Sequence, residues 1–186
     1  RFFADVGLEP RDRNLLITFH PPTLSADSTV QCEVLLRALS ELPEVGMIFT
    51  GSNADPGGRA IDAAVRAHVA CHANSIFHAS LGSTRYIAAL KYVDSSSGIY
   101  EAPSFGTPTV NVGDRQRRRP RAASVIDCAV DASAILDALE RAFALDCSDV
   151  VNVYGDGHAA QRIVATLADL ANPDQLIRKS FRDLSA

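Results

Sequence analysis

The sequence predicts an α/β protein, a Rossmann-like open parallel sheet with helices on both faces. Short apolar runs alternate with longer segments whose apolar residues recur every three or four positions, as strands and amphipathic helices require. The runs themselves show little polar alternation, which is typical of parallel strands buried on both faces. The chain has 186 residues, of which 47% are apolar, enough for one hydrophobic core. We therefore expect a single domain over residues 1–186.

Five apolar runs are the expected strands, each bounded by polar or turn-forming residues. They span residues 15–19, 47–50, 75–79, 109–112 and 124–128. The first ten residues read as the last turn of a helix and a loop.

Five longer segments are the expected helices. They span residues 28–42, 57–69, 83–93, 131–144 and 157–170. Three of them show apolar residues at helical spacing, namely Val30, Val34, Leu35, Ala38 and Leu39 in the first, Ile61, Ala64 and Val65 in the second, and Ile135, Leu136, Leu139 and Phe143 in the fourth.

The alternation breaks at one place, before Ser95. The helix expected at 83–93 runs almost directly into Ser95, although a parallel sheet needs a strand between two such elements. Loss of a central strand would leave backbone hydrogen-bonding groups of the sheet unpaired. We therefore expect that about five residues are absent before Ser95 by comparison with an intact sheet.

Composition excludes several classes of protein. The net charge of −4 argues against a general nucleic-acid binder, and no apolar run is long enough to span a membrane. The N-terminus lacks a signal-peptide pattern, so the expected location is the cytoplasm. The cysteines show no CxxC spacing and are expected to be core thiols. Because His68, His72 and His78 also lack metal-ligand spacing, we expect no metal. We expect no cofactor either.

A serine-rich segment has the composition of a nucleotide pocket. Ser95, Ser96, Ser97 and Gly98 lead into a helix-like stretch that carries Glu101. Backbone N–H groups and hydroxyls at a helix start suit a diphosphate, and a carboxylate one turn later can accept hydrogen bonds from ribose hydroxyls. The alternative is an ordinary helix cap followed by a solvated carboxylate.

Three further candidates follow expected strands: His20, Asn53 and Arg115. Ligands of open parallel sheets bind at the carboxyl ends of the strands, so these side chains are expected at one edge. The alternatives are a structural turn histidine held by the prolines that follow it and loop capping by Asn53. Beyond Arg115 the arginine run is expected to be a solvated loop; it comprises Arg117, Arg118, Arg119 and Arg121.

Five ordered motifs point to one family. They are ITFHPPTLS at 17–25, SNADPGGRAI at 52–61, SLGSTRYIAALK at 80–91, SSSGIYEAPSFGTPTVNVGDRQ at 95–116 and YGDGHAAQRI at 154–163. Together they resemble the C-terminal half of the UDP-N-acetylglucosamine 2-epimerases, most closely the hydrolysing, sialic-acid-pathway type. The resemblance extends over nearly the whole chain.

The resemblance implies the C-terminal domain of a glycosyltransferase-B-like two-domain fold, with UDP-N-acetylglucosamine or UDP as ligand. It implies that UDP leaves by anti elimination to give a 2-acetamidoglucal, and that water then adds to give N-acetylmannosamine. The carboxylates for proton abstraction belong to the N-terminal half, which this chain lacks, and the full-length protein is expected to be a homodimer. The alternatives are a non-hydrolysing 2-epimerase, a non-catalytic UDP-sugar-binding module and a glycosyltransferase of the same architecture.

The resemblance also implies roles for particular residues. His20 faces the interdomain cleft beside the diphosphate and assists departure of UDP. Asn53 lies at the uridine or sugar end, and Arg115 faces the sugar or the phosphates.

The serine segment receives roles on the same basis. Ser95 and Ser96, with Gly98, bind phosphate, and Glu101 binds the ribose hydroxyls. Three positions depart from the family pattern: a strand ending in Gly-Asn is missing before the serines, Arg118 stands where a glycine is usual, and His158 stands where an asparagine is common.

Overall fold

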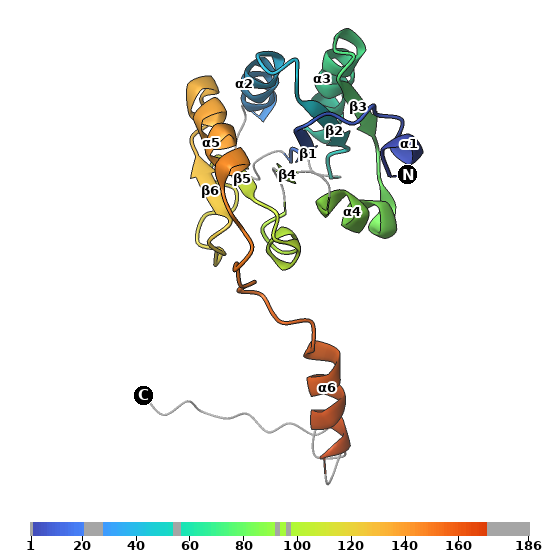
Figure 1. Ribbon diagram of the computed structural model, residues 1–186, viewed down its shortest axis with the longest axis vertical. Coiled ribbons are helices and arrows are strands. Elements are labelled where there is room, and N and C mark those ends of the chain that lie inside the picture. The colour runs from blue at the N-terminus through green and yellow to red at the C-terminus, as the bar shows by residue number, and fades with distance from the viewer. Residues whose placement is uncertain (1, 21–27, 54–56, 92–93, 96–97, 171–186) are drawn as a thin grey trace. The chain divides into compact units, whose positions relative to one another are not determined.

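The computed structural model describes residues 2–20, 28–53, 57–91, 94–95 and 98–170 (Figure 1). The chain divides into two compact units, Arg1–Tyr154 and Gly155–Ala186. The first unit holds the sheet and both hydrophobic clusters, and the second holds one described helix.

The described residues form one six-stranded sheet with the order β3-β2-β1-β4-β5-β6. All of its strand pairs are parallel, which confirms the predicted fold class. The strands are β1 (Asn14–Thr18), β2 (Gly46–Thr50), β3 (Ser75–His78), β4 (Asp94–Ser95), β5 (Thr109–Val112) and β6 (Val125–Cys128). The helices are α1 (Phe2–Val6), α2 (Ser28–Ser40), α3 (Gly58–Cys71), α4 (Gly82–Leu90), the 3₁₀-helix η1 (Ala102–Phe105), α5 (Ala132–Ala144) and α6 (Ala159–Ala168).

Both faces of the sheet are covered, because successive strand residues point to opposite sides. In β1, Leu15 and Ile17 pack into a cluster with α2, α3 and α5. Leu16 points the other way and packs with residues of α1, α4 and η1. These two groups of helices lie on opposite sides of the sheet (Figure 1). The continuous apolar strands of the sequence therefore reflect burial on both faces.

The place where the alternation broke is occupied by β4, a strand of two residues. Asp94 and Ser95 pair with Leu15 and Leu16 of β1, and Ser95 also pairs with Thr109 of β5. The expectation that Ser95 opens a helix is therefore wrong, since Ser95 lies in the central strand. With β1 at five residues and β5 at four, β4 is short for its position. The absence of about five residues before Ser95 stays a prediction.

One other expectation, that all four cysteines are core thiols, is corrected by burial. Cys32 and Cys147 are buried, as expected of core thiols, but Cys71 is exposed because it lies at the last position of α3. No helix in the described part of the chain has the length and apolar content needed to cross a membrane. Cytoplasmic location stays a prediction.

Candidate functional site

Two cavities open at the carboxyl edge of the sheet. The first is lined by Thr18, Phe19, His20, Gln31, Leu35, Ile99, Asn111, Val112, Gly113, Asp114, Arg115 and Gln116. The second is lined by Thr18, His20, Thr50, Gly51, Ala79, Ser80, Leu81, Gly82, Ser83 and Tyr86. Both include the last residue of β1 and the histidine that follows it. The ends of β1, β2 and β5 thus meet at this edge, where ligands of open α/β sheets bind.

His20 lies between the two cavities and is half-buried. Its Nδ1 accepts a hydrogen bond from the backbone N–H of Asn53 at 3.1 Å. Because that nitrogen is an acceptor, a neutral His20 ring carries its proton on Nε2. The tautomer of His20 is therefore set by a main-chain group at the end of the neighbouring strand.

The backbone N–H of Asn53 is held in position by hydrogen bonds of the preceding residue, Ser52. The backbone N–H of Ser52 donates to Asp62 Oδ1 at 2.9 Å, and the Ser52 hydroxyl donates to the Gly58 carbonyl at 2.9 Å. A Cβ at Gly58 would lie 2.6 Å from the Asn53 carbonyl oxygen, so this close approach needs glycine. The structure thus brings Asn53 to His20 through its main chain, while the Asn53 side chain is exposed.

Arg115 lies in the wall of the first cavity, in the same cavity as His20. The loop that carries it leaves β5 at Gly113, whose φ is 79° and whose N–H donates to the Cys128 carbonyl at 2.9 Å. Glycine adopts this left-handed conformation without a steric penalty. Arg115 is half-buried. Two of the predicted site residues, His20 and Arg115, are therefore brought together.

The serine segment differs from the expected helix start. Ser95 is a strand residue, Ser96 lies outside the described residues, and Gly98 is buried with its carbonyl accepting from Ala102 N–H at 3.0 Å. The helix begins only at Ala102, as a 3₁₀-helix of four residues. Glu101 is exposed just before it and is not among the described residues that line either cavity. Phosphate and ribose contacts in this segment stay predictions.

Several lining residues were missed by sequence reasoning. Thr18 and Asn111 sit inside strands, and Gln31 sits in α2. Thr18 exchanges a hydroxyl–hydroxyl hydrogen bond with Thr50 at the end of β2. A polar residue near the carboxyl end of an otherwise apolar strand was the available signal, because burial of such a group requires a partner.

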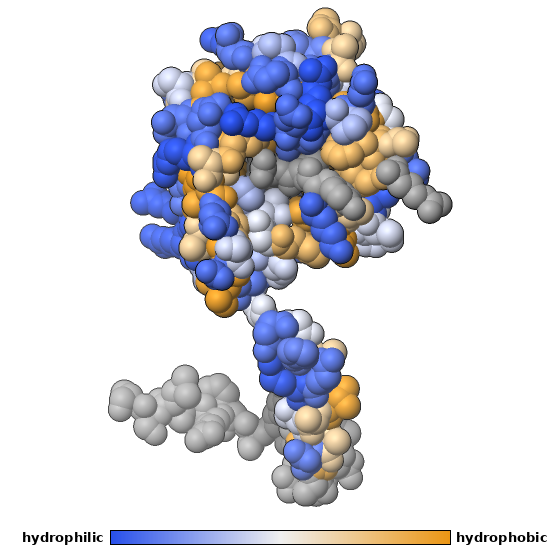
Figure 2. All heavy atoms as spheres, in the orientation of Figure 1, coloured by the Kyte–Doolittle hydropathy of each residue, from blue (hydrophilic) through white to orange (hydrophobic). Residues whose placement is uncertain are grey.

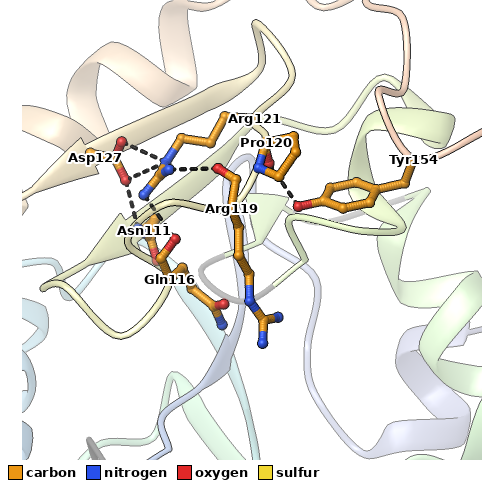
Figure 3. A network of polar contacts seen from close by, with 7 residues as sticks. All are labelled: Asn111, Gln116, Arg119, Pro120, Arg121, Asp127 and Tyr154. Atoms are coloured by element: carbon orange, nitrogen blue, oxygen red, sulfur yellow. Dashed lines mark hydrogen bonds and ion pairs between the residues drawn. The ribbon is translucent and has the colours of Figure 1, made fainter. Parts of the chain in front are cut away.

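The arginine run is only partly solvated. Arg117, Arg118 and Arg119 are exposed as predicted, but Arg121 is not. Its guanidinium lies 2.7 Å from an Asp127 carboxylate oxygen and donates to the carbonyls of Arg119 at 2.8 Å and Gln116 at 3.2 Å (Figure 3). Arg121 was expected to be a solvated loop residue; that expectation is wrong, since its donors tie the loop together.

The C-terminal side of the first unit is attached to the same loop. Tyr154 donates its hydroxyl proton to the Pro120 carbonyl at 2.8 Å (Figure 3), and its ring lies 4.4 Å from that of Tyr100. Asn152 donates to the carbonyl of Tyr100 at 2.7 Å. These contacts connect residues 152–154 to two other segments, the arginine loop and the segment before η1.

Three of the other histidines have structural contacts. His78 Nε2 donates to the Val6 carbonyl at 2.9 Å, which ties β3 to α1. The rings of His68 and His72 are stacked with centroids 3.9 Å apart, and burial lowers the pKa of His68 to about 4, with a further contribution from His72. No cluster of three or more metal-ligating side chains occurs among the residues described.

The open parallel sheet with helices on both faces and cavities at its carboxyl edge is that of a glycosyltransferase-B-like α/β domain. The chain belongs to the UDP-N-acetylglucosamine 2-epimerase family, which matches residues 4–168. This confirms the family that the five motifs indicated.

Curated relatives support the same assignment. The chain is 35% identical to a Campylobacter jejuni protein named GDP/UDP-N,N'-diacetylbacillosamine 2-epimerase (hydrolyzing), over 91% of this chain and 46% of that protein. It is 31% identical to a Legionella pneumophila protein named UDP-N,N'-diacetylbacillosamine 2-epimerase (hydrolyzing), over 93% of this chain and 47% of that protein. The chain thus spans about half the length of the curated relatives it matches.

Solved structures show the same fold. The UDP-GlcNAc 2-epimerase of Methanocaldococcus jannaschii, in complex with UDP-GlcNAc and UDP, matches with a TM-score of 0.67 at 16% identity over 90% of this chain and 47% of that one. The Staphylococcus aureus MnaA–UDP structure matches with a TM-score of 0.64 at 16% identity, over 90% of this chain and 46% of that one.

Proposed function

We propose that this chain is the UDP-binding half of a hydrolysing UDP-N-acetylglucosamine 2-epimerase. In the whole protein the reaction is elimination of UDP from UDP-N-acetylglucosamine followed by addition of water, giving N-acetylmannosamine. The observation that carries the proposal is the shared cavity of His20 and Arg115 at the carboxyl edge of the sheet. The hydrolysing relatives and the UDP-containing neighbours support it.

The two residues have complementary roles in the elimination. The guanidinium of Arg115 offers positive charge to a diphosphate whose negative charge grows as the sugar–oxygen bond breaks. His20 carries its proton on Nε2 when neutral, because Nδ1 accepts from Asn53. The Nε2–H group can donate a hydrogen bond to the departing phosphate oxygen and stabilise the negative charge that develops there. Removal of the sugar proton requires a base that we assign to the N-terminal half, so the chain alone does not turn over.

The sugar has a second candidate. The Campylobacter and Legionella relatives are both named for N,N'-diacetylbacillosamine, and the former for GDP as well as UDP. A diacetamido sugar on either nucleotide is therefore the alternative substrate. Competition between the two nucleotide sugars for the full-length protein separates these candidates. We also propose that the full-length protein is a homodimer, which light scattering tests.

The central experiment uses the 186-residue chain with UDP and UDP-N-acetylglucosamine. We expect weak, saturable binding of UDP in a nuclear magnetic resonance titration and no release of UDP from the nucleotide sugar. The variants His20→Ala and Arg115→Ala test the two roles. Arg115→Ala is expected to weaken UDP binding by about tenfold or more, as loss of a charge-assisted contact does.

His20→Ala is read in a longer protein that carries the N-terminal half. There we expect the rate of UDP release to fall by about 100-fold, the scale of one hydrogen-bond donor that stabilises charge developing in the transition state. Turnover by the isolated chain would contradict the assignment of the catalytic base to the N-terminal half. A chain that binds no UDP would contradict the proposed function itself.

A further inference from the structure

One residue that lines the first cavity, Gln116, has a side-chain atom without a hydrogen-bond partner among the described residues. The side-chain carbonyl oxygen Oε1 of Gln116 is buried and accepts no hydrogen bond from any described residue. Two other buried side-chain oxygens, Thr109 Oγ1 and Ser124 Oγ, are also unpaired, but neither residue is among those that line the cavity. A buried carbonyl without a donor destabilises the free protein. At Gln116 a ligand in the cavity can supply the missing donor.

The position of Gln116 is held by its main chain. The Gln116 carbonyl accepts from Arg121 Nη2 at 3.2 Å and from the Arg119 N–H at 3.2 Å. The same guanidinium donates from Nε to Asp127 Oδ1 at 3.0 Å. These bonds anchor the loop that carries Gln116 to strand β6 (Figure 3).

The contact between Arg121 and Asp127 also connects to a second residue that lines the cavity. Asn111, which lines the cavity from β5, donates from Nδ2 to Asp127 Oδ1 at 2.6 Å and stands opposite Asp127 in the sheet register. Arg121 and Asp127 thus connect two lining residues from different elements. Arg121 bonds the lining residue Gln116 directly and the lining residue Asn111 through Asp127, so its part in binding is to position them.

We propose that Gln116 is a ligand-binding residue whose amide carbonyl accepts a hydrogen bond from an O–H or N–H group of the bound nucleotide sugar, and that Arg121 positions it. The inference rests on the proposed function, since it takes the nucleotide sugar as ligand. The donor has two sources, the ribose hydroxyls of the nucleotide and the hydroxyl or acetamido groups of the amino sugar. Both sources offer an O–H or N–H group, and a carbonyl oxygen can accept a hydrogen bond from either.

The experiment titrates the 186-residue chain with UDP and, separately, with UDP-N-acetylglucosamine. Gln116→Met keeps the length of the side chain and removes the acceptor, and Gln116→Leu removes it with a second shape. Both variants are expected to bind about fivefold more weakly, the scale of one neutral hydrogen bond. Both are expected to raise the thermal midpoint of the free chain, because the unpaired carbonyl is gone. A purely structural residue would lose stability and binding together.

The two ligands distinguish the source of the donor. A loss with UDP-N-acetylglucosamine alone supports the inference and assigns the donor to the amino sugar, whereas an equal loss with UDP supports it and assigns the donor to the nucleotide. Unchanged affinity for both ligands in both variants overturns the inference while the proposed function stands. A wild-type chain that binds neither ligand overturns both.

The positioning role of Arg121 is tested by a double-mutant cycle. Arg121→Lys keeps the charge but loses the planar fork that reaches two carbonyls and the carboxylate. It is expected to weaken binding in the wild-type chain and to add little in the Gln116→Met background, because it acts through Gln116. Arg117→Lys, an exposed neighbour in the same loop, is the matched control and leaves affinity unchanged. Fully additive losses overturn the positioning role.

Discussion

At the scale of single residues, Arg118 departs from the family pattern at a position where the backbone conformation favours glycine. Its φ is 70°, in the left-handed region where a side chain is strained and glycine is not. The family's usual glycine at this position therefore fits the backbone better than the arginine does. The same position also belongs to the loop that carries Arg115 and Gln116.

We expect Arg118→Gly to raise the free energy of unfolding by about 1 kcal/mol, because the left-handed strain is relieved. Urea denaturation of the 186-residue chain measures it. Arg117→Gly is the matched control: it removes the same charge one residue earlier, where φ is not positive, and it is expected to lower stability. Equal effects of the two substitutions would show that charge, not backbone conformation, matters in this loop.

His68 is a second residue whose chemistry depends on its surroundings. Its ring meets Phe49 edge-on at 5.6 Å and stacks on His72. Burial, and then the nearby His72, lower its pKa from 6.5 to about 4. The unfolded chain therefore binds a proton between pH 6.5 and 4 that the folded chain does not. The stability contributed by the neutral ring is complete above pH 6.5 and is lost as the pH falls towards 4.

We expect the free energy of unfolding of the wild-type chain to fall more steeply between pH 6.5 and 4 than that of His68→Gln. The comparison concerns slopes, because glutamine also loses ring contacts and lowers stability at every pH. His158→Gln, at an exposed histidine, is expected to keep the wild-type slope. Urea midpoints at half-unit pH intervals provide the measurement, and identical slopes for wild type and His68→Gln would contradict the lowered pKa.

At the scale of elements, the short strand β4 is the weak point of the sheet. It contributes two residues between β1 and β5, although β1 offers five and β5 four. A longer central strand would offer more backbone groups for pairing with β1 and β5, and more side chains for the core. In β4 these groups come from two residues only. The sequence predicted a break in the strand–helix alternation at this place, where the structure has a strand of two residues.

We expect insertion of Val-Val-Ile-Gly-Asn between Asp94 and Ser95 to raise the free energy of unfolding by at least about 2 kcal/mol. Three apolar side chains then enter the two existing clusters, and each contributes on the order of 1.5–3 kcal/mol before the cost of ordering. Insertion of Gly-Ser-Gly-Ser-Gly at the same point is the control and is expected to stabilise nothing. A fall in stability with the apolar insertion would show that β4 is complete at two residues.

Element boundaries followed from local pattern to within a few residues. The strand at 109–112 and the periodic helix at 131–144 are observed at Thr109–Val112 and Ala132–Ala144, with Asp131 capping the helix by accepting from the Ala134 N–H. The serine segment failed because a short polar run is compatible with a helix cap and with a strand end. Only pairing with β1 and β5 selects the strand.

At the scale of the whole molecule, the two units differ in how they are stabilised. The first contains both hydrophobic clusters, whereas α6 in the second has no buried residue. Ile163, Val164 and Leu167 of α6 are all more than half exposed, and Figure 2 shows apolar surface on this helix. Most helical stability comes from packing of an apolar face, and α6 is the one helix described in its unit.

We expect deletion of residues 155–186 to change the free energy of unfolding of the first unit by less than about 0.5 kcal/mol, because the described residues of both hydrophobic clusters all precede residue 155. UDP binding is expected to persist, since both cavities belong to residues before 155. Circular dichroism during urea unfolding and a UDP titration of the shortened chain test this. A loss above about 1 kcal/mol would show that α6 supports the first unit.

The sequence by itself determined the α/β class, the family and the edge of the sheet where His20 and Arg115 lie. These follow from periodicity and from motif order, which are properties of local sequence. Only the tertiary structure decided that Ser95 is a strand residue, that Glu101 is apart from the cavities, and that Arg121 anchors the loop of Gln116 to Asp127. The physical reason is that strand pairing, burial and long-range hydrogen bonds depend on residues distant in the chain, which no local pattern contains.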